Sequence, residues 1–421
     1  MATASGYSER SHRFGSIDAV RGAAMLFVFL SHFTGGYSWT ADSREFASYL
    51  GAVSMIASPT FVIVSGMVVG FLAATRPREF SALRVKLVDR GLFLLLFGHL
   101  ILSLTLAPAR GGFVHAYRAS FITDAIAVAI LVGPWLVSAA SALARIALSA
   151  FVFLLGWWAI LAWHPVGPAL VAKTYFVGLT STSGELGAFP VFPIIPWFAV
   201  YVLGTVVGEH LGKMYTAGDR VGAHQFLAKI GAGCFASAAM IHAGAMVLRR
   251  VPGASIQWDS NLLTLTSIYG KFPPGIVYLG FFGGAGILML TTIFEIDRRG
   301  KFPAAVEALR KIGRASLFVF TIQYGLYRSI LPRLGLPYTP LWPVLFLVTV
   351  ILLAKLAAVW DKHHGNRFLT VGITSHWRRH LMRDPVSLLS SAVSRHRPTR
   401  IEPFGASGHW KTYHKPGSQL R

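Results

Sequence analysis

The feature that most constrains this chain is a series of apolar segments, each about as long as a bilayer-spanning helix. A helix needs roughly 20 predominantly apolar residues to cross the hydrocarbon core of a membrane. Ten such segments follow one another along the chain, at 18–37, 50–73, 91–107, 120–138, 143–163, 191–211, 227–248, 275–294, 315–332 and 341–360. The sequence therefore predicts an all-α, polytopic bundle of about ten transmembrane helices, with the lipid bilayer as its surroundings.

Composition supports a membrane protein and argues against a nucleic-acid partner. Of the 421 residues, 54% are hydrophobic and only 13% are charged, whereas about a quarter of a soluble domain is charged. The net charge of +22 would suit nucleic acid, but that reading needs a basic domain with stacking aromatics, and the sequence shows none. Lys and Arg instead collect in short cytoplasmic loops of membrane proteins, so we expect no nucleic acid among the partners.

The positions of Lys and Arg also predict the orientation. They concentrate in the amino-terminal segment, in the loops around 76–90 and 298–314, and in the tail, which lie on one side if all ten segments cross. We expect a bacterial inner-membrane protein with both termini in the cytoplasm. The predicted regions are a cytoplasmic amino-terminal segment at 1–16, a transmembrane domain at 17–360 and a basic, disordered cytoplasmic tail at 361–421.

Three ionisable residues interrupt the first apolar segment, which reads DAVRGAAMLFVFLSH from Asp18 to His32. Arg21 and His32 are eleven residues apart, so on a helix they lie within about 20° of each other and about 16 Å apart along the axis. Asp18 precedes Arg21 by three residues, a spacing at which the two side chains can pair. Ionisable groups at membrane depth generally face the bundle interior or a wet cavity. The sequence predicts a polar stripe here, although a His32 that only hydrogen-bonds a neighbouring helix fits the same pattern.

Two other polar residues, His99 and Asp124, lie in or beside apolar segments and are candidates for binding a substrate. Asp124 fits equally well as a cap at the start of the fourth segment, and His99 as a structural hydrogen-bonding group. We expect no metal site, although the paired histidines at 363–364 could bind a metal in vitro. The glycines spaced by four at 204, 208 and 212 predict close helix packing.

Several segments in the same order carry a resemblance to a known family. The Arg-x10-His spacing in IDAVRGAAMLFVFLSH resembles the signature of the membrane acyltransferase-3 superfamily, and ASPTFVIVSGMVVGF is similar to its second-helix pattern. FPIIPWFAVYVLGTVVG, KFPPGIVYLGF and GRASLFVFTIQ resemble segments of its heparan-α-glucosaminide N-acetyltransferase branch. Two positions depart from that branch: Gln323 stands where it has His, and Gly275 where it tends to have Ser. Gln323 can orient a substrate by hydrogen bonds but cannot shuttle a proton.

The resemblance implies transfer of an acyl group, commonly acetyl from cytosolic acetyl-CoA or another acyl-CoA, to a sugar amine or hydroxyl of a glycan or glycolipid at the opposite face. His32 would be the base or the acyl-carrying nucleophile, with Asp18 holding Arg21 in place. A cationic site for the CoA phosphates is expected in RPREFSALRVKLVDRG, from Arg84, Lys86 and Arg90, although cytoplasmic loops collect basic residues without any ligand.

Two alternatives remain open at the level of sequence. A relative resembling glucan succinyltransferases would use succinyl-CoA and a hydroxyl acceptor. A non-enzymatic transporter or flippase would use His32, His99 and Asp124 as a proton relay, and its basic loops would serve topology alone. A CoA-dependent enzyme needs a cationic phosphate site and a transporter does not, so that site separates the two classes.

Overall fold

The fold is taken from a computed structural model, which describes residues 14–37, 39–179, 192–251, 259–334 and 341–372. The predicted disordered tail lies outside the described residues from position 373 onward, as does most of the predicted amino-terminal segment. Within the described residues the chain is helical, and its only strand-like pairing is an isolated bridge between Lys271 and Pro274. The predicted all-α class is confirmed.

The longer helices form most of the bundle. They are α1 (Gly15–Gly36), α3 (Ala57–Thr75), α4 (Phe80–Phe93), α7 (Ile122–Ala139), α8 (Ala142–Ala162), α10 (Ile194–Thr216), α11 (Arg220–Leu248), α13 (Ile276–Arg298) and α16 (Trp342–Lys362). Shorter helices connect or extend them: α2 (Arg44–Ser54), α5 (His99–Leu106), α6 (Phe113–Tyr117), α9 (Pro168–Phe176), α12 (Ser260–Thr266), α14 (Pro303–Arg314) and α15 (Ser316–Gly325).

All ten predicted spans coincide with helix. Within the described residues, nine helices or helix pairs are long and apolar enough to cross a membrane, including α2 with α3 and α4 with α5. The remaining predicted span, 315–332, is α15 continued by a π-helical turn at Leu326–Ile330 and a 3-10 turn ending at Leu334. The helical backbone satisfies its own hydrogen bonds, which is why apolar segments in lipid adopt it. The chain is an integral, multi-pass membrane protein.

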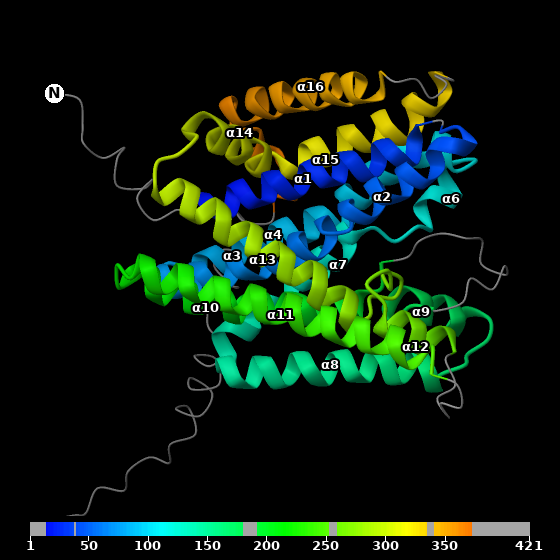
Figure 1. Cartoon of the computed structure of the whole chain (residues 1–421). Helices are drawn as coiled ribbons and strands as arrows, with labels where there is room; N and C mark the ends of the chain where they lie inside the picture. Colours follow the sequence, from blue (N-terminus) through cyan, green and yellow to red (C-terminus); the bar gives the residue numbers. More distant parts are fainter. Residues whose placement is uncertain (1–13, 38, 180–191, 252–258, 335–340, 373–421) are drawn as a thin grey trace, which may run out of the picture. The chain divides into compact units, whose positions relative to one another are not determined.

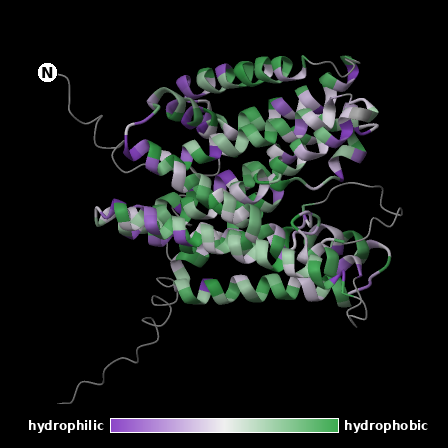
Figure 2. Ribbon diagram, viewed as in Figure 1, coloured by the Kyte–Doolittle hydropathy of each residue, from purple (hydrophilic) through white to green (hydrophobic). Residues whose placement is uncertain are grey.

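Two ends of the bundle are named here by the helices that lie there (Figure 1). The α14 end is where α1 begins at Gly15, and the α6 end is where α1 ends at Gly36. Hydrophilic residues gather on α14, whereas α8 is coloured hydrophobic along most of its length (Figure 2). Large apolar side chains on α8 are exposed, among them Leu143, Phe151, Leu154 and Trp158. Lipid, as the solvent of this face, explains that exposure.

Small residues allow the inner helices to touch backbone to backbone. A Cβ added at Gly204 of α10 would lie 2.3 Å from the carbonyl oxygen of Ile63 on α3, and one at Gly208 would lie 2.0 Å from that of Met67. The predicted role of this glycine stripe in close packing is confirmed. Gly275 is explained in the same way, because a Cβ there would lie 2.3 Å from the carbonyl oxygen of Thr264.

Helix α1 is held along its whole length by the segment that contains α14, α15 and the π-helical turn. A Cβ on Gly313 of α14 would lie 1.8 Å from the carbonyl oxygen of Asp18, and a Cβ on Gly36 would lie 1.8 Å from that of Tyr327. These two backbone contacts, at opposite ends of α1, fix α15 alongside it. Residues of α15 therefore face the polar stripe of α1.

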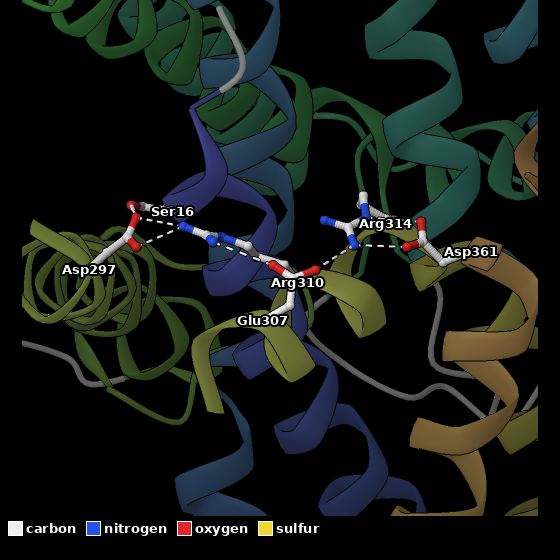
Figure 3. Close-up of polar contacts among 6 residues, drawn as sticks. All are labelled: Ser16, Asp297, Glu307, Arg310, Arg314 and Asp361. Atoms are coloured by element: carbon white, nitrogen blue, oxygen red, sulfur yellow. Dashed lines mark hydrogen bonds and ion pairs between the residues drawn. The ribbon is translucent and has the colours of Figure 1, made fainter. Parts of the chain in front are cut away.

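A row of alternating charges anchors α14 to three neighbouring helices (Figure 3). Arg310 donates to both carboxylate oxygens of Asp297 at 2.7 Å, and Asp297 also accepts from Ser16 at 3.0 Å. Arg314 bonds Glu307 at 2.9 Å and Asp361 at 2.8 Å. The row joins the ends of α1, α13 and α16 through α14. Networked pairs of this kind hold geometry better than isolated surface pairs do.

Candidate active site

A cavity at the centre of the bundle brings together the two ends of the polar stripe on α1. Arg21 and His32 both line it, with residues of α3, α4, α7 and α15 and with Phe192 and Lys271 from loops. It contains about 1040 Å³ of empty space, part of which is open solvent. Its described lining contains the cations Arg21, Arg90 and Lys271 but no Asp or Glu. We call it the central cavity.

The environment of His32 fixes which ring nitrogen is available. Its Nδ1 lies 2.8 Å from Oε1 of Gln323, a fully buried side chain on α15. The amide nitrogen of Gln323 donates to the carbonyl oxygen of Phe320 at 2.9 Å, so Oε1 is the atom turned to the ring. Because an amide oxygen only accepts, Nδ1 must carry the proton. A neutral ring then keeps its lone pair on Nε2, which has no hydrogen-bond partner among the described residues.

Arg21 is positioned near the α14 end of the central cavity by two neighbours. Its Nη2 donates to the hydroxyl oxygen of Ser316 at 2.6 Å, and its Nη1 lies 3.8 Å from a carboxylate oxygen of the buried Asp18. The pairing of Asp18 with Arg21 that the spacing predicts is present. Ser316 reaches Arg21 because the Gly22 and Gly313 positions let α14 cross α1 in contact with its backbone.

The three predicted phosphate-binding residues of α4 have different environments. Arg90 lines the central cavity. Arg84 is buried, with its guanidinium carbon 4.6 Å from the ring centre of Trp135 on α7 and an Nη2 contact of 3.3 Å to Ser81. Lys86 is exposed and does not line the cavity. The structure thus separates Arg90 from the other two, which lie off the cavity wall.

His99 and Asp124 contact each other away from the central cavity. Nδ1 of His99 lies 3.0 Å from Oδ2 of Asp124, and its Nε2 lies 2.9 Å from the carbonyl oxygen of Tyr117. Asp124 also accepts from the backbone N–H of Phe121 at 2.8 Å, as a cap at the start of α7. With both ring nitrogens facing acceptors, a doubly protonated His99 satisfies both contacts. Neither residue lines the central cavity.

Lys271 is a cavity residue that the sequence analysis did not select. Its Nζ lies 5.2 Å from the ring centre of Phe272 and 5.7 Å from that of Phe192, and no described carboxylate pairs with it. Removal of the ammonium from water, reinforced by the charge of Arg328, lowers the pKa of Lys271 to about 8. Lys271 is the first residue of KFPPGIVYLGF, one of the segments that carry the family resemblance.

Tyr324 is the second residue that sequence reasoning missed. Its ring meets the His32 imidazole edge to face, with centres 4.5 Å apart, and it lines the central cavity. It follows Gln323 directly, and Phe320, whose ring centre lies 6.1 Å from that of His32, precedes Gln323 by three residues, so these three neighbours of the imidazole all come from α15. The sequence carries no signal for Tyr324 beyond its place directly after Gln323, the last residue of GRASLFVFTIQ.

Comparison with known proteins places the whole bundle in one family. A family model described as an acyltransferase domain matches residues 14–360. This range includes every residue of the central cavity and every helix of the bundle except the last two residues of α16. No curated protein matches the chain at a significant level.

Proposed function

The chain belongs to the acyltransferase family whose domain spans residues 14–360, and we propose that it moves an acyl group, acetyl in the first instance, from an acyl-CoA to a sugar amine or hydroxyl. The observation that carries this proposal is the open Nε2 of His32 in a cavity lined by the cations Arg21, Arg90 and Lys271. Several sequence motifs resemble the heparan-α-glucosaminide N-acetyltransferase branch, which supports a sugar as the acceptor. The acceptor is then a glycan or glycolipid at the α6 end.

His32 supplies the base for this reaction. Nε2 takes the proton of the acceptor hydroxyl or amine while the acceptor atom attacks the thioester carbonyl. The carbon–sulfur bond then breaks, and the proton held by His32 passes to the departing CoA thiolate. Gln323 acts as a positioning residue, because its amide oxygen holds the proton on Nδ1 and leaves Nε2 free. In a two-step route the same lone pair is the nucleophile and takes the acyl group onto His32. Labelled acetyl that stays bound to the protein when no acceptor is present would reveal this route.

The donor enters from the α14 end, which we propose faces the cytoplasm. Arg21 and Arg90 are the two arginines that line the central cavity, and arginine binds phosphate through two parallel hydrogen bonds. Asp18 and Ser316 hold the Arg21 guanidinium. The CoA phosphates bind near this entrance, and the acyl-bearing arm extends along the cavity toward His32.

The test is acetyl release from labelled acetyl-CoA by purified protein, compared with His32→Ala. We expect His32→Ala to lower the rate by about 100-fold or more, the usual contribution of a positioned base. His242→Ala is the control, because His242 bonds the carbonyl oxygen of Thr266 at 3.1 Å and does not line the cavity. Wild-type protein that neither binds CoA nor releases acetyl would contradict the enzyme and favour the transporter alternative.

The donor site is tested separately by a pair of substitutions on α4. Arg90→Gln is expected to raise the KM for acetyl-CoA by about tenfold, the loss of one charge-assisted contact. Lys86→Gln removes the same charge from the same helix at an exposed position outside the cavity, and its KM is expected to stay near that of wild type. Equal effects of the two changes would mean that general positive potential, and no specific phosphate contact, attracts the donor.

A further inference from the structure

A second pocket opens at the α6 end and shares one wall with the central cavity. Arg110, Arg328 and Arg333 line it, with Gly35, Ser329 and Tyr324 among their neighbours. Tyr324 belongs to both linings, so this residue lies between the two spaces. Since that ring also touches the imidazole of His32, a molecule in this second pocket lies next to the proposed reaction centre. We call it the arginine pocket.

The arginine pocket is lined by cations and, among the described residues, by no carboxylate. Its described lining holds three guanidinium groups and no Asp or Glu. Arg328 donates to the carbonyl oxygen of Gly35 at 3.2 Å, and Arg333 contacts that of Pro108 at 3.4 Å. Neither Arg328 nor Arg333 pairs with a carboxylate in the part of the chain that the structure describes. Backbone carbonyls orient these side chains but carry no countercharge.

The cations of the two spaces also act on one another. Burial lowers the pKa of Arg110, and the charge of Arg328 adds to that lowering. Arg328 likewise contributes to the lowered pKa of Lys271 in the central cavity. Positive groups held this close repel each other, and an anion between them would relieve the repulsion. The backbone supports the arrangement, since Arg328 lies in the π-helical turn Leu326–Ile330, a feature frequent at functional sites.

The location makes this cluster unusual for a membrane protein. In the orientation proposed above, the α6 end faces away from the cytoplasm, where short loops tend to lack Lys and Arg. The topological bias that explains the basic loops at the α14 end therefore does not explain three arginines around one pocket at the other end. A ligand of opposite charge does explain them.

We propose that the arginine pocket binds an anionic group, phosphate or carboxylate, carried by the acceptor, and that Tyr324 separates this group from the carbon–oxygen or carbon–nitrogen bond formed at His32. This inference rests on the proposed function and narrows the acceptor to an acidic sugar. A phosphate would come from a sugar phosphate or a lipid-linked sugar, and a carboxylate from a uronic acid.

The first experiment measures transfer of labelled acetyl by the full chain to glucosamine 6-phosphate, glucuronic acid and neutral glucose. For at least one of the two acidic sugars, we expect a KM at least tenfold below that for glucose. The acidic sugar with the lower KM identifies the anion. Arg328→Gln and Arg333→Gln are each expected to raise that KM about tenfold and leave the KM for glucose unchanged. Arg118→Gln, which removes an exposed charge after α6 outside the pocket, is expected to change neither. Equal use of glucose and the acidic sugars would overturn the inference.

The second experiment separates failure of the pocket from failure of the proposed function. Purified protein is melted in sodium phosphate and in sodium chloride of equal ionic strength. Phosphate is expected to raise the melting temperature of wild type and Arg118→Gln but not that of Arg333→Gln. This readout needs no catalysis, so it stands even if acetyl release is absent. If phosphate raises the melting temperature of the pocket variants as much as that of wild type, and acetyl release is intact, the inference about the arginine pocket is overturned. The acyltransferase proposal then stays in place.

Discussion

The histidines at positions 32 and 99 lie in similar apolar helices but have opposite surroundings. His32 faces a neutral amide through Nδ1, keeps Nε2 open and lines the central cavity. His99 faces a carboxylate on one side and a carbonyl oxygen on the other, outside that cavity. A ring with one committed nitrogen can accept a proton, whereas a ring with two committed nitrogens stabilises the helices that hold it. The second nitrogen, more than burial, distinguishes a candidate base from a structural group.

The largest expected effect separates the two histidines by activity and stability. Removing the His32 ring takes away the base, so His32→Ala is expected to lower acetyl transfer about 100-fold or more with little change in the unfolding midpoint. His99→Ala leaves the buried Asp124 without its ring partner and is expected to lower the free energy of unfolding by about 3 kcal/mol. Transfer per folded molecule and thermal unfolding measure both.

The contrast would break if His99→Ala abolished transfer in protein that stays fully folded. That result would restore His99 and Asp124 to the role of acceptor-binding groups, which remains a prediction from the sequence. Asp124→Asn is the companion variant, because it keeps the size of the side chain and its acceptor for the Phe121 N–H.

A smaller effect is expected from the group that orients His32. Gln323→Leu removes the acceptor of the Nδ1 proton, so the ring is free to turn or to change tautomer, and we expect kcat to fall about 10- to 100-fold. Gln323→Glu places a carboxylate against the ring and favours its protonated form. The acid side of its pH–rate profile is therefore expected to move to higher pH. A Gln323→Glu profile identical to that of wild type would mean that Gln323 serves packing alone.

The smallest expected effect concerns Lys271 and the pH range near 8. Its lowered pKa means that the cation is present below about pH 8 and is lost as pH rises through that value. The KM for an acidic acceptor is expected to rise several-fold between pH 7 and pH 9 in wild type. Lys271→Arg keeps the charge in that range and is expected to remove the rise. A rise of the same size in Lys271→Arg would assign it to another group.

The titration of Lys271 has the opposite effect on the stability of the fold. The unfolded chain holds the Lys271 proton up to a higher pH than the folded chain does, so this residue makes folding more favourable as pH increases above about 8. Binding and stability therefore change in opposite directions over one pH interval. Measuring both on wild type and Lys271→Met separates the titration of Lys271 from alkaline unfolding.

Much of the fold was predictable because lipid imposes a local rule. Apolar segments of sufficient length must be helical, and all ten were found from their composition alone. The beginning of α4 was harder to predict from the sequence. The helix starts at Phe80, well before the apolar run, and its charged first turns do not resemble a membrane span. Likewise α9 lies within a loop rich in small residues, where no apolar period indicated a helix.

The site was predictable only where its geometry is local. The shared face of Arg21 and His32 and the pairing of Arg21 with Asp18 follow from residue spacing on one helix. The environments of Arg84 and Arg90 do not. Both belong to one basic stretch of sequence, but Arg84 packs on Trp135 while Arg90 lines the cavity, and only the position of α7 decides between them.

By itself, the sequence determined that this chain crosses a membrane as helices and that one of them carries an arginine and a histidine on the same stripe. The tertiary structure decided which nitrogen of His32 is open, because Gln323 comes from a helix almost 300 residues away in the chain. It also decided that Lys271 and Tyr324 share the cavity and that three arginines surround the space beyond. Periodicity fixes the faces of a single helix, whereas contacts between helices depend on glycine positions at which two backbones can meet.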